Sequence, residues 1–111
     1  MPDALQAGWN GAPVCERLLE DTLQRVLRCD FLPGEIHERH FHPPHIGYAI
    51  AGGRVRIVDD SGSRDLELAT GSRYFSDGVA WHEVMDIGDT TIKYFIIDNG
   101  ISLEWLHRGV L

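Results

Sequence analysis

The sequence predicts an all-β protein, a sandwich or a barrel, and three features of the chain lead to this expectation. Turn-forming pairs such as Pro33-Gly34, Gly52-Gly53 and Asn99-Gly100 recur at short intervals. The runs between the turns are short, and many are rich in the Val, Ile, Tyr, Phe and Thr residues that favour strands. Several runs also alternate apolar and polar residues with the period of two that is typical of a half-buried strand.

The expected strands follow one another with only short connections. Within one of them, Val55 and Ile57 share one face while Arg54 and Arg56 share the other. The last strand is continuously apolar after Lys93, which is typical of a strand covered on both faces. The predicted strands are residues 23–32, 35–41, 48–51, 54–59, 64–68, 73–76, 82–86 and 91–98.

The length of 111 residues predicts one domain with short irregular or helical ends. We expect an N-terminal segment over 1–22, a barrel over 23–98 and a C-terminal segment over 99–111 that packs on the barrel. Residues 1–12 are rich in Gly and Ala, so we expect them to be poorly ordered unless they dock on a partner. The segment 16–23 could form helical turns or a first strand, and 101–111 could form a short helix or another strand.

Composition excludes several classes of function. A net charge of −7 argues against a nucleic-acid partner, which would require a basic face. The chain has no apolar run long enough to span a membrane, and its first residues do not resemble a secretory signal. We therefore expect a cytoplasmic protein. Cys15 and Cys29 have no CxxC spacing, so we expect free thiols, with Cys29 buried and inert.

The histidines indicate a metal site. Four of the six lie between positions 37 and 45. In a strand, side chains alternate between the faces, so His40 and His42 project from the same side. His82 lies in a later predicted strand and supplies a third imidazole, the commonest protein ligand for transition metals. The sequence predicts one divalent ion, which could be Fe, Zn, Ni or Mn.

These residues resemble the first of the two motifs of the cupin superfamily. In that motif a Gly is followed after five residues by His-x-His, then by a Glu and a second Gly. Gly34, His40, His42 and Gly53 fit this frame without a gap, but Ile46 stands where the family usually has Glu.

The second motif matches more loosely. Gly71 and His82 fall on their positions, whereas Asp77, Val79 and Asp86 replace the usual Pro, Gly and Asn. The two matches together cover roughly residues 25–98.

The resemblance implies a double-stranded β-helix, or jelly-roll cupin barrel, in which His40, His42 and His82 point inward as metal ligands. Ile46 would then leave a neutral three-histidine site with open positions for water, substrate or dioxygen. His45 could become a fourth ligand or a base beside the metal if Pro43-Pro44 rotate it inward. By the same alternation, His37 faces away from the ligand pair, toward solvent or a subunit interface.

The wall of a small barrel can enclose one ligand. Tyr48, Tyr74, Trp81 and Phe95 are the candidate pocket residues, each of which could equally be plain core. Arg54 or Arg73 could meet a carboxylate substrate.

The first functional hypothesis is a metal-dependent enzyme, similar to dioxygenases, that acts on a small organic acid or thiol. A non-catalytic small-molecule sensor and a sugar or keto-acid isomerase are the alternatives, because the fold does not decide among them. Small cupins resemble one another in pairing through their sheets, so we also expect a homodimer. In it, the leucines of 18–23 and the apolar C-terminus would cover edge strands.

Overall fold

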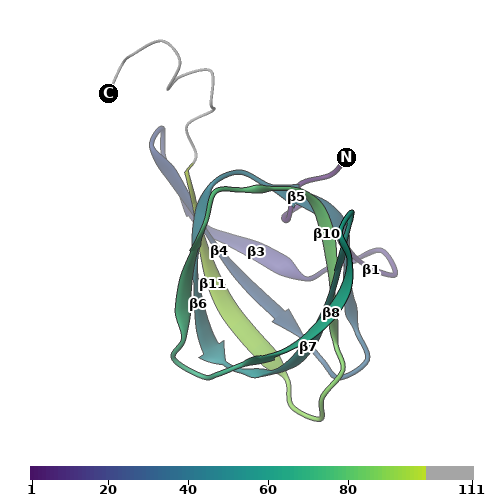
Figure 1. Ribbon diagram of the computed structural model, residues 1–111. Helices are drawn as coiled ribbons and strands as arrows, with labels where there is room; N and C mark the ends of the chain where they lie inside the picture. Colours follow the sequence, from purple (N-terminus) through teal and green to yellow (C-terminus); the bar gives the residue numbers. More distant parts are fainter. Residues whose placement is uncertain (100–111) are drawn as a thin grey trace.

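Two antiparallel sheets form a barrel in the computed structural model, which describes residues 1–99 (Figure 1). One sheet has the strand order β5-β10-β7-β8 and the other the order β3-β4-β11-β6-β9, while β1 and β2 form a small separate ribbon. The strands are β1 (Gly8–Trp9), β2 (Ala12–Pro13), β3 (Cys15–Glu20), β4 (Gln24–Phe31), β5 (Ile36–His42), β6 (His45–Ala51), β7 (Gly53–Asp59), β8 (Gly62–Leu68), β9 (Arg73–Ser76), β10 (Val79–Asp86) and β11 (Ile92–Asn99).

The all-β prediction is confirmed, and every predicted strand is present as one of β4 to β11. β6 and β10 each begin three residues earlier than the sequence predicts. No helix occurs within residues 1–99, so of the two alternatives for 16–23 the strand is correct, and it is β3. The C-terminal segment beyond β11 lies outside the described residues. The described part of the chain contains no helix long and apolar enough to cross a membrane.

The two cysteines form a disulfide, which corrects the prediction of free thiols. Cys15 of β3 lies directly opposite Cys29 of β4, and their Sγ atoms are bonded at 2.00 Å. Asp30 donates its amide hydrogen to the Val14 carbonyl beside them, so the cysteines are a non-hydrogen-bonded pair, where opposing side chains approach most closely. Cys29 is buried as predicted. The cytoplasmic location stays a prediction, and disulfides are uncommon in reducing compartments.

The first residues of the chain pack on the barrel, contrary to the expectation of poor order. Ala4 and Ala7 are buried, and the Phe41 amide donates to the Pro2 carbonyl. Asp3 also accepts a hydrogen bond from Arg25 of β4 at 3.0 Å. The N-terminal segment thus lies against β5 and extends a polar network toward the interior of the barrel.

The outer face of the five-stranded sheet carries a continuous apolar row. It contains one residue from each strand, and every member is the cross-strand neighbour of the next: Leu19, Val26, Ile97, Ile46 and Phe75. All except the half-buried Val26 are exposed. The apolar sequence of β11 predicted a strand covered on both faces. Within the described residues its outer face is not covered, because Ile97 is exposed.

Candidate metal centre

Neighbouring strands β5 and β10 bring three histidines together inside the barrel. His40 and His42 alternate on β5, so both face inward, as the sequence predicts. His82 of β10 is the cross-strand partner of His40. One potential metal-ligand atom from each of the three residues lies within 4.8 Å of those of the other two, so this group could hold a metal ion.

The nitrogens converge at a spacing that suits one ion. His40 Nε2 lies 3.0 Å from His42 Nε2 and 3.0 Å from His82 Nε2. Two nitrogens that bind one ion at about 2.1 Å and at right angles lie about 3 Å apart. The spacing of the three imidazoles therefore fits one ion bound on one face, with the remaining coordination positions open.

The tautomer of His40 supports the same conclusion. Its Nδ1–H donates to the Glu38 carbonyl at 2.6 Å, so Nε2 of the neutral ring carries a lone pair. Nε2 of His42 and Nε2 of His82 both approach this lone pair, which can fully satisfy only one donor. A cation at the meeting point satisfies all three rings, since each can then direct a lone pair at it.

Burial keeps these rings neutral, which is the form that binds metals. Desolvation lowers the pKa of His82 to about 3, and the neighbouring His40 and His45 contribute in the same direction. Desolvation likewise lowers the pKa of His42 and of His40. At neutral pH these three imidazoles are therefore uncharged.

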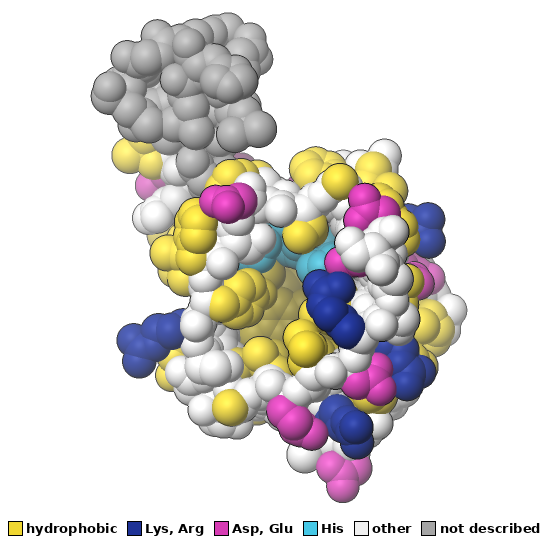
Figure 2. Space-filling model, in the orientation of Figure 1, with side chains coloured by type: hydrophobic (Ala, Val, Ile, Leu, Met, Phe, Trp, Pro, Cys, Tyr) yellow, Lys and Arg dark blue, Asp and Glu magenta, His cyan; other side chains and the backbone are white. Residues whose placement is uncertain are grey.

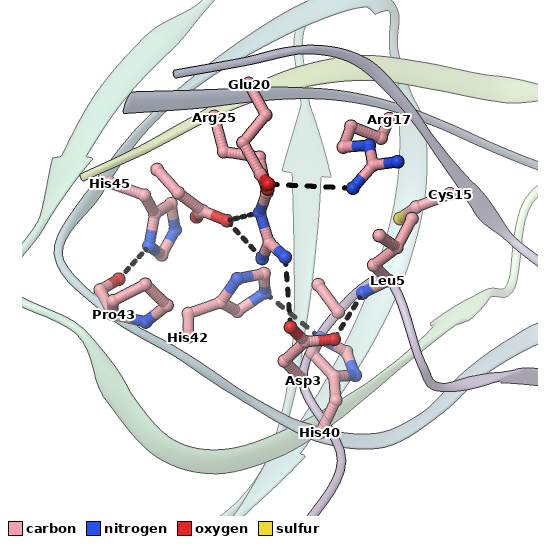
Figure 3. A network of polar contacts seen from close by, with 12 residues as sticks. Asp3, Leu5, Cys15, Arg17, Glu20, Arg25, His40, His42, Pro43 and His45 are labelled. Atoms are coloured by element: carbon pink, nitrogen blue, oxygen red, sulfur yellow. Dashed lines mark hydrogen bonds and ion pairs between the residues drawn. The ribbon is translucent and has the colours of Figure 1, made fainter. Parts of the chain in front are cut away.

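His45 lies beside His42 but in a second group. It is the first residue of β6, it is buried, and its Nδ1–H donates to the Pro43 carbonyl at 2.9 Å. The turn at Pro43-Pro44 does bring its ring inward, next to His42 (Figure 3). His45 forms a potential ligand group with His42 and Asp98. It is not part of the group that His40, His42 and His82 form. Its role as a fourth ligand of the same ion thus stays a prediction that would need the ring to move.

Position 46 does not face the histidines, which corrects the expectation that a carboxylate is missing there. Ile46 follows the inward-facing His45, so it lies on the outer face of the sheet and is 49% exposed. Because β6 begins directly after the proline turn, its first inward-facing residue is His45, whose ring centroid lies 4.4 Å from that of His42.

His37 is buried, so the prediction that it faces solvent or an interface is wrong. Its ring stacks on that of His40 with the centroids 3.7 Å apart, and its Nε2–H donates to the Ala4 carbonyl. The cause is a β-bulge. His40 pairs with His82 and His37 with Val84, so β5 has one extra residue, and this reverses the alternation.

A cavity of about 430 Å³ opens in front of the histidines. Figure 2 shows it as a hollow with hydrophobic side chains inside and histidine on its wall. His42, His45 and His82 line it, together with apolar residues of both sheets. The other lining residues are Phe31, Ala49, Val55, Ile57, Arg64, Leu66, Glu67, Leu68, Ser72, Arg73, Tyr74, Ser76, Val79, Val84, Tyr94 and Ile96.

Of the four predicted pocket residues, only Tyr74 lines this cavity. Its ring lies over Gly47, where any Cβ would collide with it. Tyr48 and Phe95 are cross-strand neighbours on the outer face. Trp81 lies outside too, in a bulge of β10, with the Arg39 guanidinium carbon 3.9 Å from its ring centroid.

Tyr94 and Arg64 also line the cavity, although the sequence did not indicate either of them as a pocket residue. Tyr94 is adjacent to Phe95 in a continuously apolar strand, so alternation could not show which of the two faces inward. Arg73 lines the cavity as suggested, whereas Arg54 lies near Glu67 at 3.9 Å on the neighbouring strand and does not line it.

Comparison with solved structures identifies the fold. A cupin domain from Bordetella pertussis has a TM-score of 0.73 at 20% identity over 78% of this chain and 91% of its own. A Klebsiella pneumoniae protein with a double-stranded β-helix domain has a TM-score of 0.65 at 20% identity over 82% and 80%. A predicted oxalate decarboxylase from Thermotoga maritima has a TM-score of 0.57 at 20% identity over 77% and 78%.

The chain therefore has the fold of a small cupin domain, a double-stranded β-helix, as the motifs predicted. No protein-family profile matches it, and no curated protein matches it in sequence.

Proposed function

We propose that this protein is a metal-dependent oxidoreductase of the dioxygenase kind, with His40, His42 and His82 as metal ligands and a small organic acid or thiol as substrate. The observation that supports it is the convergence of three histidines beside the cavity, with His40 Nε2 3.0 Å from Nε2 of both His42 and His82. A divalent ion there would supply Lewis acidity and adjacent open positions for substrate and dioxygen.

The charge of the donor set favours an anionic substrate. Three neutral imidazoles leave the full charge of a divalent ion uncompensated, unlike a set that includes a carboxylate. A thiolate or carboxylate that enters the cavity would restore the balance. Arg64 and Arg73 both line the cavity and are exposed, so a second anionic group of the substrate could meet a guanidinium there.

The walls would contribute by excluding water. Phe31, Val55, Ile57 and Ile96 bring apolar atoms to the cavity beside the histidines. Such a surface favours the hydrocarbon part of a small substrate over water and strengthens electrostatic interactions at the metal.

The first test is metal content. Protein purified without chelator should contain about one equivalent of a first-row transition metal, and His42→Ala should lose it. Tyr48→Ala, on the outer face, is the control and should keep the metal. Full metal occupancy in His42→Ala would refute the ligand assignment.

The second test is reaction type. The iron-loaded protein should consume oxygen with a small thiol or a β-diketone from a substrate panel, and His42→Ala should not. Tight binding of a panel member with no oxygen uptake and no product would instead support the non-catalytic sensor. The isomerase alternative has less support, because Glu67 is the one carboxylate among the described cavity residues, and it is exposed.

A further inference from the structure

A second cluster of potential ligands lies next to the three-histidine group. His45 of β6 and Asp98 of β11 are cross-strand partners, and His42 of β5 approaches them from the other sheet. The offered ligand atoms of these three residues lie within 4.8 Å of one another, and all three residues are buried. Figure 3 shows the ring of His42 between those of His45 and His40.

Two buried polar atoms of this cluster lack a hydrogen-bond partner in the described part of the chain. Asp98 Oδ1 is buried and has no hydrogen-bond partner in the described part of the chain. His42 Nδ1, the nitrogen turned away from the His40 contact, is buried without a partner there as well. His45 donates through Nδ1 to the Pro43 carbonyl, which leaves Nε2 as its nitrogen for a metal. Buried acceptors without a donor are costly unless a cation or proton joins them.

We propose that His42, His45 and Asp98 form a second site for a first-row transition-metal ion, beside the three-histidine site and sharing the ring of His42. Two imidazoles and one carboxylate are a donor set that suits Fe(II), Zn(II) and related ions. His42 would bind one ion through each nitrogen. The proton on its ring passes to solvent as the second metal–nitrogen bond forms, which leaves a bridging imidazolate.

The surrounding charges hold Asp98 in place for this role. Arg25 binds Asp98 Oδ2 through Nη2 at 2.6 Å and through Nε at 3.0 Å, which leaves Oδ1 free. Asp3 binds Arg25 on its other side at 3.0 Å and compensates its charge, so the trio of Arg25, Asp98 and Asp3 has one net negative charge. His42 and His45 both line the cavity, which gives an ion a route to the site.

Two divalent ions on one imidazole repel each other, so the second should bind more weakly than the first. The inference adds to the proposed three-histidine site without depending on the reaction there. Its test needs a measurement that separates the two ligand sets, and metal stoichiometry does so because only His42 is common to both.

The experiment is a calorimetric Zn(II) titration of chelator-treated protein, in two buffers of different ionisation enthalpy so that proton release is also counted. Wild type should bind two equivalents and release a proton with the second. Asp98→Asn and His45→Phe should each bind one. Tyr48→Ala, on the outer face of the same sheet, is the control, and it should still bind two. His82→Ala should bind one, at the second site.

Three other results decide against one site or the other. If wild type binds one equivalent, and Asp98→Asn and His45→Phe bind one as well, the inference is wrong and the three-histidine site stands. If one equivalent persists in His82→Ala and disappears in Asp98→Asn and His45→Phe, the inference stands and the three-histidine assignment is wrong. Should Asp98→Asn fail to fold, His45→Phe leaves the Arg25 pair intact, and two equivalents in that variant would overturn the inference.

Discussion

Removing the Cys15–Cys29 disulfide should destabilise the protein by an amount that follows from the chain it closes. The two cysteines are 14 residues apart. In the chain-entropy treatment, a crosslink that closes a loop of about this length restricts the unfolded state by about 3 kcal/mol. That is a large share of the roughly 5–15 kcal/mol by which domains are stable, and it corresponds to a fall in Tm of roughly 12–24 °C.

The assay is urea denaturation of three samples: oxidised wild type, wild type under reductant, and Cys15→Ala with Cys29→Ala. Reduced wild type should lose about 3 kcal/mol of unfolding free energy. The double variant should lose slightly more, because both side chains are buried and their sulfur atoms leave small voids. Detection of two free thiols in unreduced protein under denaturing conditions would show that the disulfide is absent, and a loss below about 1 kcal/mol on reduction would show that it contributes little to stability.

Further predictions concern the polar network and the assembly. Arg25→Met should lower the free energy of unfolding, measured by urea denaturation, by about 3–5 kcal/mol, because it leaves Asp98, which is 1% exposed, without its ion-pair partner. A loss under about 1 kcal/mol would contradict this. Although desolvation raises the pKa of Asp3, hydrogen bonds from the Gln6 amide and Arg25 outweigh it and lower the pKa below its usual 3.8. Ionised Asp3 therefore stabilises the fold above about pH 4, and this contribution should vanish as the pH falls through its lowered pKa. Asp3→Asn should show a shallower acid-induced fall in Tm than wild type, and identical pH profiles would exclude the role. Sedimentation should show a homodimer at micromolar concentration, and a monomeric wild type would rule the dimer out. Phe75→Lys, in the exposed apolar row, should convert the dimer to a monomer. Leu32→Lys, which is exposed but outside the row, should leave the dimer intact.

The fold could be predicted from sequence because its signals are local. Turn residues and period-two alternation show where strands begin and end, and the spacing of His40, His42 and His82 fits the two motifs. β3 was only one of two alternatives, because Glu-Arg-Leu-Leu-Glu has no alternation and is exposed along most of its length. The disulfide depends on the pairing of β3 with β4, which turn signals do not specify.

The site could be predicted only where a strand is regular. His40 and His42 lie on an unbroken stretch of β5, so alternation placed them correctly. The same count failed for His37, because a bulge adds a residue, and for Ile46, because the proline turn starts a new strand at His45. In β11 every residue after Lys93 is apolar up to Asp98, so neither Tyr94 nor Phe95 could be preferred for the interior.

A crystal structure of metal-loaded protein, with anomalous diffraction recorded at the absorption edge of the bound metal, would show directly whether the three histidines bind one ion. We expect an anomalous peak within about 2.0–2.2 Å of Nε2 of His40, His42 and His82 together. A peak bound to fewer than three of these nitrogens, or fully loaded crystals with metal only on surface residues, would contradict the three-histidine assignment.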